Sequence, residues 1–324
     1  MRLTLTIVML ALLPDGDLSV VRAQEALNQT PQRLTNIISS YPSPSPDGKR
    51  VLFQSNRTGR WEIFVMNIDG SDLTKLTDRP GDNVTPVWSP DGELIAFAAS
   101  PGGNSDVYVM KSDGSDLRRL TDQPGDDSHP HWSADGGRIM FNSARTSPDI
   151  GGDWLSQWHE VFSMKRDGTD LHQHTHQKTV CTYPSFSPDG TKIVYRKILN
   201  TSGFAWDLSS RPRNSEVFVA EADGSDEINL SDSAAFDGWP TWSPDGDRIV
   251  FASNRAGPAN VGHLYIVNVD GTGLRQITSG PWSYVQPAWS HNGSKIFAYQ
   301  NQETTSFEFG DVVVVDVPDA NTGH

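Results

Sequence analysis

Cysteine is almost absent from this sequence, because Cys181 is the single one in 324 residues. One cysteine cannot form a disulfide within the chain. The stability of the fold must therefore come from packing rather than from covalent cross-links.

Basic residues are also scarce relative to acidic ones. The chain has 26 Lys and Arg against 40 Asp and Glu, which gives a formal net charge of −14, and no stretch is rich in Lys or Arg. Nucleic acid binding depends on basic side chains that neutralise phosphates. We therefore expect no nucleic-acid partner, and the charge disfavours anionic membrane surfaces as well.

Long apolar runs are lacking too. The stretch 3–13, which follows Arg2, is apolar but too short to span a bilayer. It resembles an export signal, because Val21-Arg22-Ala23 offers a small-residue cleavage site before Gln24. We predict an export signal over 1–23, a linker over 24–32, no transmembrane segment, and a periplasmic or secreted location. A disordered start on a cytosolic protein is the alternative.

Glycine and proline, by contrast, are plentiful, with 28 and 21 residues. They recur in the phrase Trp88-Ser89-Pro90-Asp91-Gly92, in which proline, aspartate and glycine each favour a tight turn. Related phrases begin at Pro44, Trp132, Phe186, Trp242 and Trp289, so that six copies lie 44 to 56 residues apart. An internal repeat of this length is typical of propellers and solenoids. Trp88, Trp132, Trp242 and Trp289 share one position in it, and we predict that they are core residues.

The residues around each phrase have the pattern of strands. Apolar residues such as Arg50-Val51-Leu52-Phe53 follow it, and a third strand such as Ile63-Phe64-Val65-Met66 comes next. A second turn, Asp69-Gly70-Ser71 in the first unit, leads to a short fourth strand near Leu76-Thr77. Its aspartate is interpreted as turn-forming rather than as a calcium ligand. Four strands per unit predict an all-β fold, a six-bladed β-propeller of four-stranded blades over 33–317 with a tail at 318–324.

The two ends of the repeat predict how the ring closes. The sixth unit ends after its third strand, Val312-Val313-Val314-Val315, and has no fourth. A segment that matches a fourth strand lies instead near the start of the chain, at Arg33-Leu34-Thr35-Asn36. We therefore expect this N-terminal strand to complete the last blade and to remove the open edge.

These repeats resemble the TolB-like (WD-repeat-like) six-bladed propeller family over roughly residues 33 to 317. The resemblance implies an all-β ring that is used mainly for protein binding, with some enzyme relatives. The sequence contains no Gly-x-Ser-x-Gly elbow, no His-Glu-x-x-His and no phosphate-binding glycine loop. The family's smaller α/β domain before the ring has no counterpart here, which puts membership of the Tol envelope machinery in doubt.

Two neighbouring units carry long insertions between their second and third strands. Antiparallel connectivity places these loops on the face opposite the Asp-Gly turns. The insertions contain the candidate ligand-binding residues Trp154, Trp158, His159, Trp206 and Asp207. Exposed aromatic side chains there favour recognition of sugar rings, a proline-rich peptide or a protein partner. The alternative is that they fold back over their own loops.

A second group of candidates lies on the innermost strands. One residue precedes the proline of each, namely Tyr41, Thr85, His129, Tyr183, Trp239 and Gln286, and the residues two positions later are Ser43, Val87, His131, Ser185, Thr241 and Ala288. We expect the first set to encircle the channel mouth on the insertion face. Its aromatic and polar members indicate a ligand mouth rather than a packed plug, with partial burial between blades as the alternative.

The best candidates for metal ligands are His129 and His131, with Asp127 nearby, because two histidines and a carboxylate suit several divalent metals. The leading interpretation is nevertheless a non-enzymatic, monomeric, exported module that needs no cofactor. It would bind a protein or a glycan through its loop-decorated face. The alternative is a metal-dependent carbohydrate-active enzyme, as the resemblance to propeller lyases implies.

Overall fold

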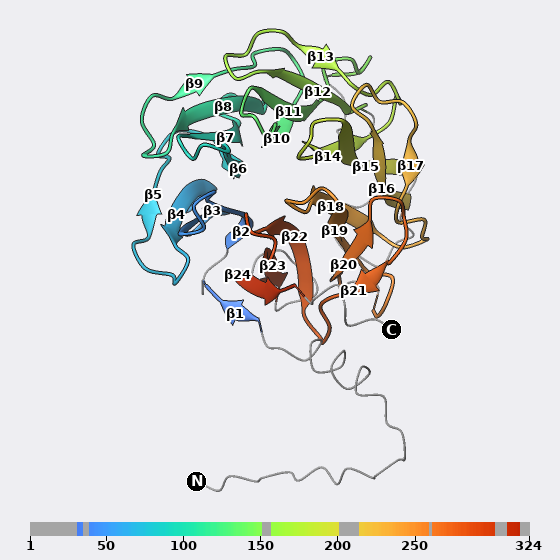
Figure 1. The fold of residues 1–324 in the computed structure, drawn as a ribbon. Coiled ribbons are helices and arrows are strands. Elements are labelled where there is room, and N and C mark those ends of the chain that lie inside the picture. Colours follow the sequence, from blue (N-terminus) through green and yellow to red (C-terminus); the bar gives the residue numbers. More distant parts are fainter. Residues whose placement is uncertain are drawn as a thin grey trace, which may run out of the picture. The chain divides into compact units, whose positions relative to one another are not determined.

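The computed structural model describes residues 31–34, 39–150, 157–200, 214–258, 261–301 and 310–317. Residues 31–317 form one compact unit. The described residues form 24 strands in six four-stranded antiparallel sheets, arranged as the blades of a β-propeller (Figure 1). None of these residues lies in a helix that is long and apolar enough to cross a membrane. The predicted fold class is therefore confirmed.

In the first five blades the strands follow one another in chain order from the axis outward, and in the sixth the N-terminal strand takes the outermost place. The first blade contains β2 (Ser39–Pro44), β3 (Arg50–Ser55), β4 (Glu62–Asn67) and β5 (Thr74–Lys75), and the second β6 (Asn83–Trp88), β7 (Leu94–Ala99), β8 (Asp106–Lys111) and β9 (Arg118–Arg119). The third contains β10 (Asp127–Trp132), β11 (Arg138–Ser143), β12 (Glu160–Lys165) and β13 (His172–Gln173), and the fourth β14 (Cys181–Phe186), β15 (Lys192–Asn200), β16 (Asn214–Glu221) and β17 (Ile228–Asn229). The fifth contains β18 (Asp237–Trp242), β19 (Arg248–Ser253), β20 (His263–Asn268) and β21 (Arg275–Gln276), and the sixth β22 (Ser283–Trp289), β23 (Lys295–Asn301), β24 (Gly310–Asp316) and β1 (Gln32–Arg33).

The N-terminal strand β1 closes the ring as the sequence predicts. It pairs antiparallel with β24 through Gln32 opposite Val314 and Arg33 opposite Val313, and Leu34 N donates to Val312 O at 2.8 Å. The strand begins one residue before the predicted segment, and positions 35–38 lie outside the described residues. Because β24 has β23 on its other side, both of its edges are paired.

The repeated turn between the first two strands is held by its own side chains. In the first blade, Ser45 Oγ donates to Asp47 Oδ1 at 2.5 Å, and Lys49 N donates to the same oxygen at 3.1 Å. Gly48 has a φ of 69°, the left-handed region that a residue with a Cβ adopts at a cost. The aspartates of the second glycine turns act similarly, since Ser71 N donates to Asp69 Oδ1 at 2.9 Å. Both hydrogen-bonding patterns agree with the turn-forming interpretation of these residues.

The repeated tryptophans pack between blades. Trp88, Trp132, Trp242 and Trp289 are at most 7% exposed, which confirms the prediction that they are core residues. The guanidinium of Arg50 lies 4.8 Å from the ring centroid of Trp88 in the next blade. A second buried contact links the strands within a blade: Ile63 N donates to Thr77 Oγ1 at 2.9 Å, and this hydroxyl donates to the buried Glu62.

Candidate functional site

The candidate ring residues on the innermost strands share an unusual backbone. Tyr41, Thr85, His129, Tyr183, Trp239 and Gln286 all have φ between 50° and 55°. A positive φ is uncommon for residues other than glycine, and it is a marked outlier for β-branched Thr85. In each inner strand the pairing with its neighbour shifts at this position, as in a β-bulge. The strain repeats in all six blades, so it belongs to the architecture and not to one site.

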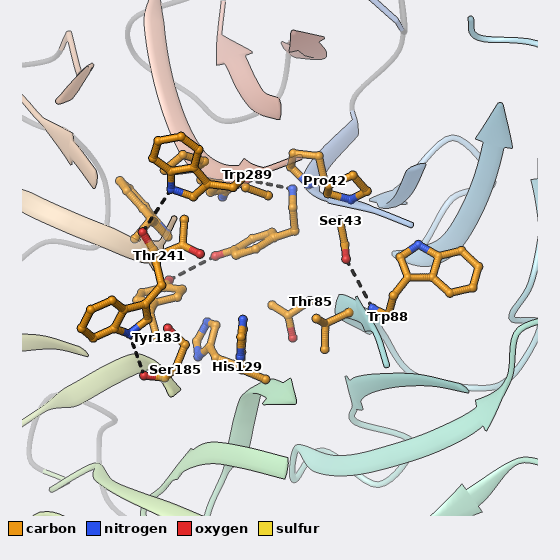
Figure 2. Close-up of a pocket in the computed structure, with 18 of the residues that line it drawn as sticks. Pro42, Ser43, Thr85, Trp88, His129, Tyr183, Ser185, Thr241 and Trp289 are labelled. Carbon is orange, nitrogen blue, oxygen red and sulfur yellow. Dashed lines mark hydrogen bonds between the residues drawn. The ribbon is translucent and has the colours of Figure 1, made fainter. Parts of the chain in front are cut away.

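The ring side chains meet across the channel axis. The hydroxyls of Tyr41 and Tyr183, on the first and fourth blades, are 3.1 Å apart and hydrogen-bonded (Figure 2). The ring of Tyr183 has its centroid 3.9 Å from that of His129 and 5.9 Å from that of Trp239. Gln286 Oε1 accepts a hydrogen bond from Tyr41 N at 3.0 Å. These contacts pack several of the ring side chains against one another, and we call this layer the floor; the expectation of a ligand mouth stays a prediction.

A cavity of about 360 Å³ lies against this floor. Its wall includes the ring residues, the prolines that follow them, and the positions two residues later, Ser43, Val87, His131, Ser185, Thr241 and Ala288. It also reaches Pro46, Pro244 and His291, which lie in or beside the turns between first and second strands. Those turns share a face with the Asp-Gly turns, because strands in a blade are antiparallel. The cavity therefore extends toward the face of the Asp-Gly turns, whereas the sequence predicted a ligand mouth on the insertion face. The aromatic rings of Tyr41, Tyr183 and Trp239 occupy the channel on the other side of the cavity.

Two hydroxyls in the cavity wall are buried and make no hydrogen bond within the described part of the chain. Ser185 Oγ and Thr85 Oγ1 belong to side chains that are 2% and 8% exposed, and Figure 2 shows both residues at the cavity. A buried polar atom without a partner costs about 1–3 kcal/mol. Ser43 differs, because its Oγ accepts a hydrogen bond from Trp88 N at 3.3 Å. These two hydroxyls and Trp88 Nε1 are cavity-wall groups without a hydrogen-bond partner among the described residues.

The two cavity histidines are neutral near pH 7. His129 Nδ1 is 2.8 Å from Asn142 Oδ1, and His131 Nδ1 is 3.0 Å from Trp132 O. Burial lowers the pKa of His129 to about 3 and that of His131 to about 4. Each histidine borders the cavity, but the surrounding protein excludes enough water to make the protonated, charged form of the imidazole ring unfavourable. A neutral ring whose Nδ1 donates to these oxygens has Nε2 as its remaining acceptor.

Asp127, the third candidate for a metal site, points elsewhere. Its Oδ2 forms an ion pair with Arg145 Nη2 at 2.9 Å, and it is not part of the cavity wall. Burial raises the pKa of the Asp127 carboxyl, an effect that the nearby Arg145 opposes. Among the residues that the structure describes, no three His, Cys, Asp or Glu side chains gather into a group suited to a metal ion.

Sequence reasoning missed Arg196, which is fully buried behind the floor. Its Nε donates to Thr182 Oγ1 at 3.0 Å, and its guanidinium carbon lies 4.8 Å from the ring centroid of Tyr183. A Cβ added at Gly238 would come within 3.2 Å of Arg196 Cδ, so this glycine makes room for the arginine. Alignment of the blades could have identified Arg196, because the equivalent residue is uncharged in the neighbouring blades: Asn142 in the third and Ala252 in the fifth.

The insertion candidates are only partly described. Trp154, Trp206 and Asp207 lie outside the described residues. Trp158 is half-buried, with Lys178 Nζ 5.6 Å from its ring centroid. His159 is fully buried and its Nδ1 lies 3.5 Å from Asn142 Nδ2, so it belongs to the layer behind His129. Binding by this loop surface stays a prediction.

Curated relatives match parts of the chain. The uncharacterized peptidase YuxL of Bacillus subtilis is 32% identical over 115 residues, 36% of this chain and 16% of that protein. A TolB homolog of Chlorobium luteolum is 31% identical over 136 residues, 33% of this chain and 31% of that protein. The chain thus spans less than half the length of these relatives.

Solved structures share the fold over most of the chain. TolB from Acinetobacter baumannii superposes with a TM-score of 0.62 and 23% identity, covering 78% of this chain and 57% of that one. An oligogalacturonate lyase in complex with manganese gives 0.58 and 13% identity, covering 89% and 93%. The profile of the TolB beta propeller domain (PD40) matches residues 75–200 and 200–318. Since these two matches cover most of the sequence, the chain belongs to the TolB β-propeller domain family.

Proposed function

We propose that this protein is a binding module that holds a segment of a protein partner in its central cavity. The observation that carries the proposal is the cavity itself, with its aromatic and proline wall and its two buried hydroxyls, Ser185 and Thr85, which have no hydrogen-bond partner in the described part of the chain. Ligand sites are typically concave and mostly apolar, with a few polar groups that fix orientation. The size of the cavity, about 360 Å³, suits a few side chains rather than a folded domain.

The chemistry of the wall favours binding over catalysis. A general base works best when its pKa lies near the operating pH. The cavity histidines have pKa values of about 3 and 4, so both are weak bases at neutral pH. Cys181 is fully buried outside the cavity wall, and burial raises the pKa of its thiol well above the usual range. Neither residue type therefore supplies an activated nucleophile or base.

A photocrosslinking experiment tests the proposal. A benzoylphenylalanine at Val87, in the cavity wall, should give an adduct with one protein in an extract of the source organism. The same group at Leu73, which is 47% exposed on an outer turn, is the control and should not. Filling the cavity with Ala288→Phe should abolish the Val87 adduct. Equal adducts at both positions, or capture of glycans alone, would contradict a protein-binding cavity.

We further propose that the protein is exported to the periplasm or secreted. The N-terminal sequence supports this, because an apolar stretch follows Arg2 and a small-residue site lies before Gln24. Fractionation of cells that express the whole chain, with mass determination of the mature N-terminus, tests it. Retention in the cytosol with an intact N-terminus would exclude it.

A metal-dependent, carbohydrate-active enzyme is the second candidate, and one observation favours it. His129 and His131 each engage Nδ1 with an oxygen acceptor, as metal-binding histidines usually do. Few side chains are left to coordinate a metal ion, however, because Asp127 is paired with Arg145 and Gln286 Oε1 accepts a hydrogen bond from Tyr41 N. Titration of the metal-free protein with Mn²⁺ decides the point. One tightly bound ion that is lost in His131→Ala would support an enzyme.

A further inference from the structure

Exposed carboxylates lie on the turns between first and second strands, two of which reach the cavity wall. The wall includes Pro46 and Pro244 of two turns, and each is followed directly by an exposed aspartate, Asp47 or Asp245. The equivalent residues in the second, third and fourth blades are Asp91, Asp135 and Asp189, and all three are exposed. We call these five residues the turn aspartates. The sixth turn has Asn292 instead, beside His291 of the cavity wall.

Four of the six turns lie against the turn of the preceding blade, so most of the turn aspartates stand on adjoining turns. A Cβ added at Gly92 would lie 3.8 Å from Pro46 Cδ of the preceding blade, and one at Gly136 would lie 3.7 Å from Pro90 Cδ. The same relation holds for Gly246 with Pro188, at 3.5 Å. These are ordinary van der Waals distances, and Gly293 with Pro244 gives a fourth, at 3.7 Å, whereas Gly48 and Gly190 have no atom within 4 Å.

The turn aspartates carry full negative charge at neutral pH. A hydrogen bond from the serine two residues earlier is the main cause that lowers the pKa of Asp47, Asp135 and Asp189. Among the described residues these three form no ion pair within 4.0 Å, whereas Asp245 pairs with Arg248 at 3.0 Å. Basic residues of the same turns, Lys49 and Arg50 near Asp47 and Arg138 near Asp135, offset part of this charge. The negative charge that remains around a concave site raises the local concentration of oppositely charged ligands.

We propose that the partner segment is basic: an apolar residue enters the cavity, and flanking lysine or arginine side chains lie over the turn aspartates. The inference rests on the proposed function and adds the chemistry of the partner. Two independent features carry it. The cavity wall contains the buried hydroxyls of Ser185 and Thr85, which have no hydrogen-bond partner among the described residues, and two of the turns that bear the turn aspartates reach the same wall. Complementary charge sets partner choice and association rate.

Asn292 provides a clean way to remove the charge. It accepts hydrogen bonds from Ser290 Oγ at 2.9 Å and Ser294 N at 3.1 Å, as the turn aspartates do in their own blades. Asparagine therefore preserves this turn while carrying no charge. The test variant is D47N/D135N/D189N. The matched control is D78N/D122N/D232N, which removes three exposed carboxylates near the ends of fourth strands, on the other face.

The probes are three synthetic decapeptides with the same Pro-Leu-Tyr-Pro centre, flanked by lysine, by glutamate or by serine, and binding is measured by fluorescence anisotropy. The lysine peptide should bind at least tenfold more tightly than the glutamate peptide. The D47N/D135N/D189N variant should have about tenfold lower affinity for the lysine peptide than the wild type. The control variant should bind as the wild type does. Ala288→Phe should abolish binding of the lysine and serine peptides.

The outcomes separate the two proposals. If lysine, serine and glutamate peptides bind equally and Ala288→Phe blocks all three, the cavity binds peptide but the basic partner is wrong. The lysine peptide could bind Ala288→Phe as tightly as the wild type, or lose the same affinity in D47N/D135N/D189N and in the control variant. Either result would mean that its binding is non-specific, and the basic-partner inference would fail. If no peptide binds, the basic-partner inference fails, and the photocrosslinking result alone decides the proposed function.

Discussion

The hydroxyls of Tyr41 and Tyr183 lie 3.1 Å apart across the propeller axis, although the two residues are 142 positions apart in the sequence. They occupy equivalent positions on opposite blades, and burial raises the pKa of Tyr41 well above its usual value, so the Tyr41 hydroxyl stays protonated at neutral pH. This pair joins two opposite blades at the level of the ring residues, next to the cavity.

Removing this contact should affect stability modestly. Tyr41→Phe deletes one hydroxyl of the pair but preserves the ring, so we expect a loss of about 0.5–1.5 kcal/mol in the free energy of unfolding. Tyr183→Phe in the Tyr41→Phe background should cost less than in the wild type, because the shared hydrogen bond is already gone. Urea unfolding of the four proteins measures the coupling. Strictly additive losses would mean that the hydroxyls do not interact.

The closing strand should be required for a stable monomer. Deletion of residues 24–37 removes β1 and leaves β24 with an unpaired edge. We expect a lower melting temperature and concentration-dependent association, measured by calorimetry and by light scattering. An unchanged melting temperature with a monomeric species would show that the pairing of β1 with β24 contributes little.

A core tryptophan that does not line the cavity should act on stability alone. Trp132 is 3% exposed and is absent from the cavity wall, unlike Trp88. Trp132→Ala should lower the free energy of unfolding by about 3–5 kcal/mol. Trp282→Ala is the matched control, since Trp282 is 39% exposed and its loss should cost less than about 0.5 kcal/mol. Equal losses in chemical denaturation would contradict the assigned packing.

Glu216 should make stability depend on pH. Burial raises its pKa to about 7, so the folded protein holds a proton that the unfolded chain, with a pKa near 4.5, releases. The contribution is therefore complete below about pH 4.5 and is lost as the pH rises toward 7. Glu216→Gln should reduce the fall in stability between pH 5 and pH 8 by on the order of 1–2 kcal/mol, with the wild type as reference. Parallel profiles for both proteins would exclude this role.

The architecture could be predicted from the sequence because each blade repeats the same local chemistry. Ser-Pro-Asp-Gly specifies a turn from four adjacent residues, and the matching segment around Arg33 reveals the closure. The ring position of Tyr41 could also be inferred, since the proline after it marks the register. What could not be inferred is where the side chain goes. A positive φ at a bulge directs Tyr41 across the axis to Tyr183, and this contact depends on three-dimensional geometry alone.

Arg196 illustrates a second limit. Because buried charged residues are rare, an arginine in a strand is predicted to be exposed to solvent. Only an alignment of the repeats position by position indicates otherwise. Its burial depends on Gly238 of the next blade, which leaves space for the side chain. Such compensation between blades has no local signature in the sequence.

The central claim is that the partner binds in the cavity and not on the insertion loops. The most direct measurement is calorimetric titration of the crosslinked partner, once purified, against two variants. Ala288→Phe fills the cavity, and Trp158→Ala removes the half-buried aromatic side chain of the loop surface. We predict that Ala288→Phe weakens binding at least tenfold, about 1.4 kcal/mol or more, and that Trp158→Ala leaves it unchanged. Loss of binding in Trp158→Ala with wild-type affinity in Ala288→Phe would contradict the account.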